Sequence, residues 1–183
     1  MKYSWKVSCA SRILRRDKLI VHATESVFGI AASAYSLRAI TEIKRLKARG
    51  SQKNFLVIVA NLEQVLNLVR IDVPYREQII DSWPGHSTWI LPATELAPPW
   101  LLDDNGFMGV RMTSHIQASD LCQRSGPLVS TSANTSGNLP ALTLTQARKY
   151  FGKEIDYYLP GELGVNSRPS RIQNGVTGKL IRS

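Results

Sequence analysis

Short apolar runs alternate with amphipathic segments along most of this chain, and that alternation constrains the fold more than any other feature. The runs at residues 19–23, 55–60 and 107–112 have the length and composition of buried strands. The segments at 36–49 and 143–151 place apolar residues at helical spacing behind a capping Ser or Thr. Strands that alternate with helices predict an α/β layered domain.

The predicted elements leave little of the chain unassigned. Helices are expected at residues 4–16, 36–49, 61–69, 74–83, 114–124 and 143–151, and strands at 19–23, 55–60, 87–91, 107–112, 127–129 and 156–159, with two final strands around the turn Asn174-Gly175. The late hairpin favours a mixed sheet over a purely parallel one. A length of 183 residues suits one domain, so we predict a single domain over residues 1–183.

The chain is strongly basic, with 23 Lys and Arg against 14 Asp and Glu and a formal net charge of +9. Such a surplus favours polyanionic partners such as nucleic acid, nucleotides or an anionic membrane. The longest fully apolar run, 55–60, is far too short to span a membrane, and basic residues interrupt any signal-like stretch near the start. Two cysteines are too few for a disulfide framework. We expect a cytoplasmic protein without a membrane partner.

A polar stretch follows the predicted strand at 127–129 and is a candidate ligand site. Seven of the eight residues from Ser130 to Gly137 are Ser, Thr, Asn or Gly. An apolar run that opens into hydroxyls and an amide is how α/β proteins present polar ligands at the carboxyl end of a strand. The alternative is an ordinary turn, because the same residue types dominate turns.

A basic stretch at residues 44–53 precedes the strongest predicted strand. It contains five basic residues and no acidic one, and Lys47, Arg49 and Lys53 are among them. Cations that lie where the chain returns to the sheet are candidates for phosphate binding. The alternative is a solvated basic face, because cations are also favoured at the C-terminal end of a helix.

Further candidates lie near the ends of two other predicted strands. Thr24 follows the first strand and is either a ligand contact or a turn or capping residue. Arg111 lies among apolar neighbours near a strand end, so it needs an anionic partner in the protein or in a ligand. Glu25 is a candidate general base, although a carboxylate without an identified partner is more often structural. His22 lies within an apolar run and is expected to be a core histidine.

Several well-known motifs are absent from the sequence. It has no Walker A, Gly-x-Gly-x-x-Gly or Gly-x-Ser-x-Gly pattern. His22, His86 and His115 fall in separate segments without zinc spacing, so a metal held by protein ligands alone is not expected. Mg²⁺ bound mainly through substrate phosphates needs few protein ligands and stays open.

In their order along the chain, several short motifs resemble the YrdC family, most closely its short bacterial members. They are Thr-Glu-Ser-Val-Phe-Gly at 24–29, Lys-Ala-Arg at 47–49 with Lys53, Pro-Gly at 84–85 with Thr88 and Trp89, Val-Arg-Met-Thr at 110–113 with His115, Ser-Thr-Ser-Ala-Asn at 130–134 with Ser136 and Gly137, and Arg-Pro-Ser at 168–170. Each motif is weak alone, but the ordered set is specific and covers nearly the whole chain. The resemblance implies a twisted, mixed α/β sheet with flanking helices around a basic concave cavity.

The resemblance also implies an activity. Such proteins are nucleotidyltransferases that convert L-threonine, bicarbonate and ATP into L-threonylcarbamoyladenylate, pyrophosphate and water, with Mg²⁺ accompanying the ATP. The product serves N6-threonylcarbamoyladenosine formation at position 37 of tRNA through downstream threonylcarbamoyl-transferase machinery. By resemblance, contacts to ATP map to Lys47, Arg49, Lys53, Ser132, Asn134 and Arg182, and contacts to threonine map to Thr24, Arg111 and Ser130. The residues identify no general acid or base.

The chain departs from the family pattern at a few positions. They are Ala23, His86, Gly50-Ser51-Gln52, Asn54, and Ile58, where some relatives have a threonine-binding His. The departures concern loop geometry and the threonine contacts more than the reaction.

Two other functions are open on the sequence. A non-catalytic module that binds double-stranded RNA, tRNA or rRNA, as in ribosome maturation, would use the same net charge for phosphate contacts. A carbamoyl-transfer enzyme would act on another amine or on carbamoyl phosphate. The polar stretch at 130–137 favours the synthase, because binding a nucleic-acid backbone does not require it beside Thr24.

Overall fold

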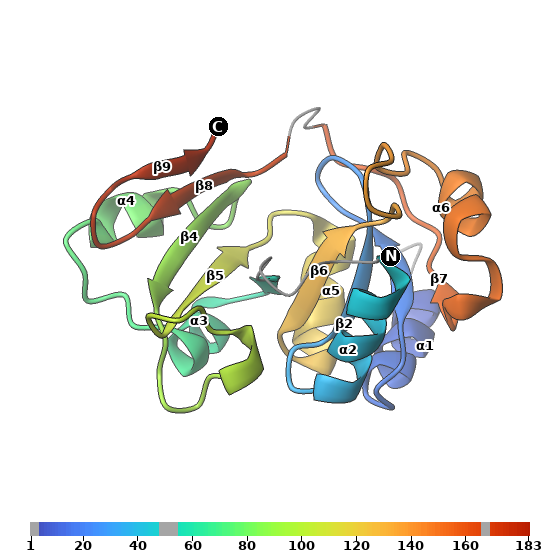
Figure 1. Cartoon of the computed structure of the whole chain (residues 1–183), viewed down its shortest axis with the longest axis horizontal. Coiled ribbons are helices and arrows are strands. Elements are labelled where there is room, and N and C mark those ends of the chain that lie inside the picture. Colours follow the sequence, from blue (N-terminus) through green and yellow to red (C-terminus); the bar gives the residue numbers. More distant parts are fainter. Residues whose placement is uncertain (1–3, 48–54, 166–168) are drawn as a thin grey trace.

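The structure is a computed structural model that describes residues 4–47, 55–165 and 169–183. Across these residues nine strands form one sheet in the order β7-β1-β2-β6-β3-β5-β4-β8-β9 (Figure 1). The strands are β1 (Ile20–Ala23), β2 (Phe28–Ser33), β3 (Leu56–Val59), β4 (Ser87–Pro92), β5 (Phe107–Met112), β6 (Leu128–Ser132), β7 (Tyr157–Tyr158), β8 (Arg171–Asn174) and β9 (Leu180–Arg182). The helices are α1 (Ser4–Leu14), α2 (Leu37–Leu46), α3 (Leu62–Leu68), α4 (Arg76–Asp81), α5 (Ile116–Ser125) and α6 (Leu144–Phe151), with 3-10 turns at Pro99–Leu101 and Gly152–Glu154.

The pairing of the strands makes the sheet mixed. β1 with β7, β3 with β5 and β4 with β8 are parallel, whereas β1 with β2, β2 with β6, β3 with β6, β4 with β5 and β8 with β9 are antiparallel. The predicted α/β fold with a mixed sheet and flanking helices is confirmed, and the late hairpin is β8–β9.

Capping side chains begin three of the helices at the places that the sequence indicates. Ser36 accepts a hydrogen bond from the backbone of α2, and Asn61 does the same for α3. Thr143 and Gln146 form a complete capping box at α6. These local signals fix where the helices start, whereas tertiary packing decides how far they run.

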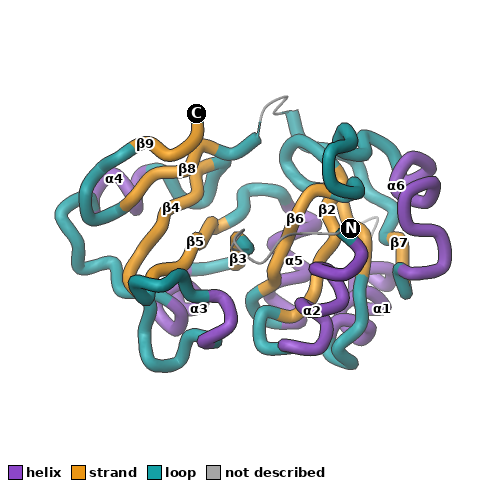
Figure 2. The backbone as a smooth tube through the Cα atoms, viewed as in Figure 1, coloured by secondary structure: helices purple, strands orange, loops and turns teal. Residues whose placement is uncertain are grey.

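The sheet separates two groups of core residues. Ile20 and Val21 are fully buried neighbours on β1, and their side chains point to opposite faces because strand residues alternate. Ile20 packs in the cluster that includes Leu121 of α5, and Val21 packs in the cluster that includes Ile40 of α2. Figure 2 shows these helices against the strands. Both faces of this part of the sheet are therefore covered, which leaves its strand ends as the place for a ligand.

Strand β2 was not predicted. Its sequence, Phe-Gly-Ile-Ala-Ala-Ser, is rich in small residues and poor in the β-branched residues that favour strands. The strand forms because β1 and β6 pair with it on both sides, so its backbone groups are satisfied by its neighbours. Here tertiary context overrides local propensity.

Strand β6 runs further than the sequence suggests. The predicted strand ends at Val129, but Ser130 and Ser132 lie within β6, which ends at Ser132. Antiparallel pairing with β2 continues through Gly29 and Ser132, and this pairing keeps the hydroxyl-bearing residues extended. Ser130 and Ser132 are thus held by a strand, whereas Asn134 lies in the turn that follows it.

Among the described residues, no helix is long and apolar enough to cross a membrane.

Candidate functional site

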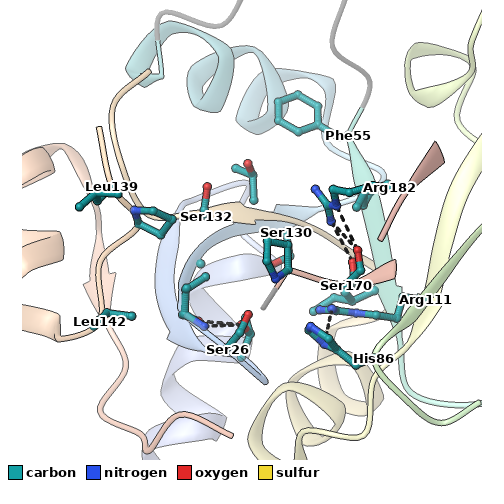
Figure 3. Close-up of a pocket in the computed structure, with 18 of the residues that line it drawn as sticks. Ser26, Phe55, His86, Arg111, Ser130, Ser132, Leu139, Leu142, Ser170 and Arg182 are labelled. Carbon is teal, nitrogen blue, oxygen red and sulfur yellow. Dashed lines mark hydrogen bonds between the residues drawn. The ribbon is translucent and has the colours of Figure 1, made fainter. Parts of the chain in front are cut away.

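A cavity of about 840 Å³ lies beside the ends of β1, β5 and β6. Its polar lining comes from Thr24, Ser26, His86, Arg111, Ser130, Thr131, Ser132, Gln146, Lys149, Ser170 and Arg182. Its apolar lining includes Val27, Phe55, Leu56, Ile58, Leu139, Pro140, Leu142 and Tyr150. Figure 3 shows one wall with Arg182, Ser170, Arg111 and His86, the opposite wall with Leu139 and Leu142, and Ser130 and Ser132 between them.

Arg111 is a buried cation of β5, and Glu25 balances its charge. Arg111 is 9% exposed, and its Nη2 lies 3.1 Å from Oε2 of Glu25, which is 3% exposed. The Oγ1 of Thr113 donates a hydrogen bond of 2.6 Å to the other carboxylate oxygen of Glu25. The anionic partner that the sequence required for Arg111 is therefore in the protein. One oxygen of Glu25 accepts a hydrogen bond and the other contacts Arg111 as an ion pair, which is typical of a structural carboxylate.

Burial and charge act against each other in this pair. Desolvation raises the pKa of Glu25, but the Arg111 cation and the Thr113 hydrogen bond outweigh it, so the pKa lies below its ordinary value. Burial lowers the pKa of Arg111 and the Glu25 charge opposes that change, yet an arginine stays protonated in proteins. Both groups are charged at neutral pH, and the guanidinium is held in place before any ligand binds.

Ser130 of β6 reaches across β2 to a histidine of β1. Its Oγ lies 3.2 Å from Nε2 of His22, which is fully buried, as expected for a core histidine. A Cβ at Gly29 of β2 would come within 2.9 Å of that Oγ, so the glycine leaves the space that the serine uses. Burial lowers the pKa of His22 to about 4, and nearby His115 acts in the same direction. His22 is therefore neutral at physiological pH.

Thr24 closes a turn and also lines the cavity. Its Oγ1 donates to the carbonyl of Val27 at 2.7 Å, which closes the turn after β1. The same residue lines the cavity and is 6% exposed. A hydroxyl that donates one hydrogen bond keeps lone pairs that can accept from a ligand.

The structure excludes a solvated basic face for Lys47, which was the alternative that the sequence left open. Lys47 is 6% exposed, and its Nζ donates to the carbonyl of Ser132 at 2.5 Å, to the carbonyl of Asn134 at 2.8 Å and to Oδ1 of Asn134 at 3.1 Å. The Oγ of Ser132 also donates to Oδ1 of Asn134 at 2.6 Å. The ammonium holds the end of β6 and the turn that follows it. Ser132 lines the cavity, whereas Lys47 and Asn134 stand outside its lining.

Arg182 of β9 is the second arginine of the lining in the part of the chain that the structure describes. Its Nε and Nη2 donate to the carbonyl of Ser170 at 3.0 and 2.9 Å, and Nη2 also donates to Oγ of Ser170 at 3.1 Å. Burial lowers the pKa of Arg182, and the charge of Arg111 lowers it further. Two guanidinium groups that disfavour each other's charge favour an anionic ligand in the same cavity.

The structure brings most of the predicted site residues together. Thr24, Arg111, Ser130, Ser132 and Arg182 line one cavity, Lys47 and Asn134 adjoin it, and Arg49 and Lys53 lie outside the described residues. No cluster of His, Cys, Asp and Glu that could hold a metal ion occurs among the residues described.

Sequence reasoning assigned no ligand role to four polar residues of the described lining, which are His86, Gln146, Lys149 and Ser170. Ser170 lies in the quoted Arg-Pro-Ser motif, so a signal for it was present although no role was assigned. The Pro-Gly turn before His86 gave no indication that its side chain faces the cavity.

The sequence is also similar to known proteins. Residues 12–183 match the family model named Sua5_yciO_yrdC, whose description is "Telomere recombination". A curated protein of Nitrosococcus oceani named threonylcarbamoyl-AMP synthase is 40% identical over 181 residues, which cover 98% of each chain. A protein of the same name from Coxiella burnetii is 35% identical over 182 residues, again 98% of each chain.

Solved structures of similar fold cover nearly all of this chain. A P. abyssi Sua5 structure complexed with L-threonine has a TM-score of 0.85 and 26% identity, covering 93% of this chain. The match spans 51% of that protein, so this chain has about half of its length. E. coli YciO has a TM-score of 0.81 over 97% of this chain, and its 21% identity supports the fold alone.

Proposed function

The chain belongs to the Sua5/YciO/YrdC family, and on that premise we propose that it makes L-threonylcarbamoyladenylate from L-threonine, bicarbonate and ATP. The observation that carries the proposal is the cavity in which Arg111, Thr24 and Ser130 meet. A fixed guanidinium beside uncharged hydroxyls suits an amino acid, which needs a cation for its carboxylate and acceptors for its ammonium group. The name of the two curated relatives, threonylcarbamoyl-AMP synthase, agrees with this chemistry.

The inner end of the cavity would bind L-threonine. Arg111 pairs with its carboxylate through the Nη atoms, because Nε is buried without a partner. The Oγ of Ser130 is held 3.2 Å from Nε2 of His22, and a serine hydroxyl has lone pairs that can accept from the amine of the substrate. Thr24 accepts from the same group or from the substrate hydroxyl. These residues would act by orienting the threonine amine, and none of them would form a covalent bond to it.

The reaction then needs two bond-forming events. The amine of threonine attacks the bicarbonate carbon, and loss of water leaves a carbamate. A carbamate oxygen next attacks the α-phosphorus of ATP, and the bond to the bridging oxygen breaks to release pyrophosphate. Because the charge develops on oxygen atoms, fixed cations and hydrogen-bond donors supply the stabilisation.

The nucleotide would occupy the rest of the cavity. Ser132 and Arg182 face that space, and Lys47, Asn134, Arg49 and Lys53 are proposed to complete the phosphate site. Lys47 and Asn134 would act there by fixing the backbone around Ser132. Mg²⁺ fits as an ion bound by the ATP phosphates, since the described lining offers hydroxyls and cations but no carboxylate cluster. When bound it neutralises phosphate charge and the departing pyrophosphate.

We place this activity in the cytoplasm, upstream of tRNA modification. The product is an activated threonylcarbamoyl group, which the machinery that forms N6-threonylcarbamoyladenosine at tRNA position 37 would consume. The net charge of +9 would also favour binding of tRNA or double-stranded RNA to the surface of the protein.

The test is pyrophosphate release measured with each substrate omitted in turn. We expect release that requires ATP, L-threonine and bicarbonate together, and mass spectrometry should detect L-threonylcarbamoyladenylate. Release that is independent of threonine and bicarbonate would contradict the proposal. Salt-sensitive RNA binding without any release would indicate a non-catalytic RNA-binding module instead.

A further inference from the structure

His86 faces the cavity from the segment that leads into β4, next to Arg111. Its Nδ1 lies 3.3 Å from Nη1 of Arg111 (Figure 3). The backbone holds it there: Gly85 donates its N–H to the carbonyl of Met112 at 2.9 Å, and the Nε1 of Trp83 donates to the carbonyl of Ser87 at 2.8 Å. The segment is therefore fastened to the end of the strand that carries Arg111.

The direction of this hydrogen bond follows from the chemistry of the two side chains. A guanidinium carries donors and no acceptor, so Nδ1 of His86 must be the acceptor. In the tautomer that provides this acceptor, the ring N–H is on Nε2. A protonated imidazole would lose the acceptor and place a second cation against Arg111.

The two partners of Arg111 contact different terminal nitrogens of its guanidinium group. Glu25 lies 3.1 Å from Nη2, whereas His86 lies 3.3 Å from Nη1. The buried Nε has no hydrogen-bond partner, so it does not help to fix the plane. With Glu25 alone the guanidinium could swing about a single contact, whereas a second contact on the other nitrogen sets its orientation.

We propose that His86 is a positioning residue for the amino-acid substrate. It sets the plane of Arg111 so that the remaining N–H groups on Nη1 and Nη2 point at the substrate carboxylate. This inference rests on the proposed function and deepens it, because it explains how one arginine becomes a directional carboxylate site. It also assigns a role to a position where the chain departs from the family pattern.

The test compares His86→Ala with His86→Asn, whose Oδ1 can take the place of Nδ1 as acceptor. We expect His86→Ala to raise the threonine KM by about tenfold, in line with the loss of a hydrogen bond to a charged group. The KM for ATP should change by less than about twofold, because the contact serves the carboxylate. His86→Asn should restore the threonine KM to within about threefold of the unchanged protein.

The outcomes separate this inference from the proposed function. If the unchanged protein releases no pyrophosphate in response to threonine, the proposed function fails and the inference fails with it. If it does so and His86→Ala has an unaltered threonine KM, the inference alone is wrong. An equal rise in the KM for ATP, or a His86→Asn variant as impaired as His86→Ala, would also overturn the inference, because either result indicates a general structural defect.

Discussion

The two sides of the cavity are built by different physical means. The inner side has charged and polar residues that are buried and paired across strands, such as Arg111 with Glu25 and Ser130 with His22. The outer side is the apolar wall around Leu139 and Leu142, which are 83% and 56% exposed. On the inner side each group is positioned by a specific side-chain partner, whereas the two leucine side chains of the outer wall are exposed.

This difference predicts where the protein is sensitive to change. Removing one partner of a buried polar pair lowers the stability of the protein strongly, because the other partner is left without a hydrogen bond or a counter-charge. An exposed apolar side chain contributes little when it is shortened. Substitutions should therefore have large effects that are specific to one substrate on the inner side, and small effects on the outer wall.

The largest effect is expected for Arg111→Lys. Lysine keeps the charge but cannot present two parallel N–H groups to a carboxylate. We predict a rise of about 100-fold in the threonine KM with a much smaller change in the KM for ATP. Steady-state kinetics with each substrate varied in turn will measure both. A collapse of ATP affinity while threonine affinity holds would assign Arg111 to the phosphates.

The second prediction concerns the pH dependence of stability. The folded pKa of His22 is about 4 against an ordinary value of 6.5. Between these values the unfolded chain binds a proton that the folded protein excludes, so the free energy of unfolding falls as the pH is lowered. The free energy of unfolding should fall by about 3 kcal/mol as the pH is lowered across that window. Well above pH 6.5 both states hold a neutral histidine, so His22 causes no loss of stability there. The pKa of Glu25 is lowered, so the stability from its ion pair is lost only at lower pH, as the pH falls through its folded pKa.

Denaturant unfolding at several pH values will measure this slope. His22→Gln keeps a hydrogen-bonding group near Ser130 but does not titrate, so it should flatten the slope between pH 6.5 and 4. The same slope in the variant would show that another group is responsible.

The third prediction concerns Lys47, for which we expect an effect smaller than on the inner side of the cavity and larger than on the outer wall. Lys47→Met keeps the apolar stem but removes the ammonium from three oxygen acceptors. We expect a loss of about 1–3 kcal/mol in the free energy of unfolding and about a tenfold fall in kcat/KM for ATP, since the turn after β6 is released. Denaturant unfolding and steady-state kinetics will measure the two effects. Unchanged stability would mean that the ammonium does not hold Ser132 and Asn134.

The smallest effect is expected on the outer wall. Leu139→Ala shortens an exposed side chain, so stability should change by less than about 0.5 kcal/mol and the KM for ATP by less than about threefold. The threonine KM should not move. A large fall in threonine affinity would break the distinction between the two sides, because it would tie the exposed wall to the buried site.

The sequence predicted the candidate residues better than it predicted their roles. Strand ends placed Thr24 and Arg111 in one cavity because apolar periodicity reports which residues are buried. Sequence spacing could not reveal that Glu25 faces Arg111, because the two are brought together only by the pairing of the strands. Nor could it show that Lys47 is buried, since a cation at a helix end looks the same whether it meets solvent or backbone carbonyls.

The most direct test of the central claim is a calorimetric titration of L-threonine into nucleotide-free protein. If the inner side is preorganised, L-threonine should bind without ATP, and Arg111→Lys should abolish that binding while a titration with ATP stays close to that of the unchanged protein. Binding of L-threonine that appears only when ATP is present, or that persists in Arg111→Lys, would contradict a threonine site fixed in advance by Arg111 and its buried partners.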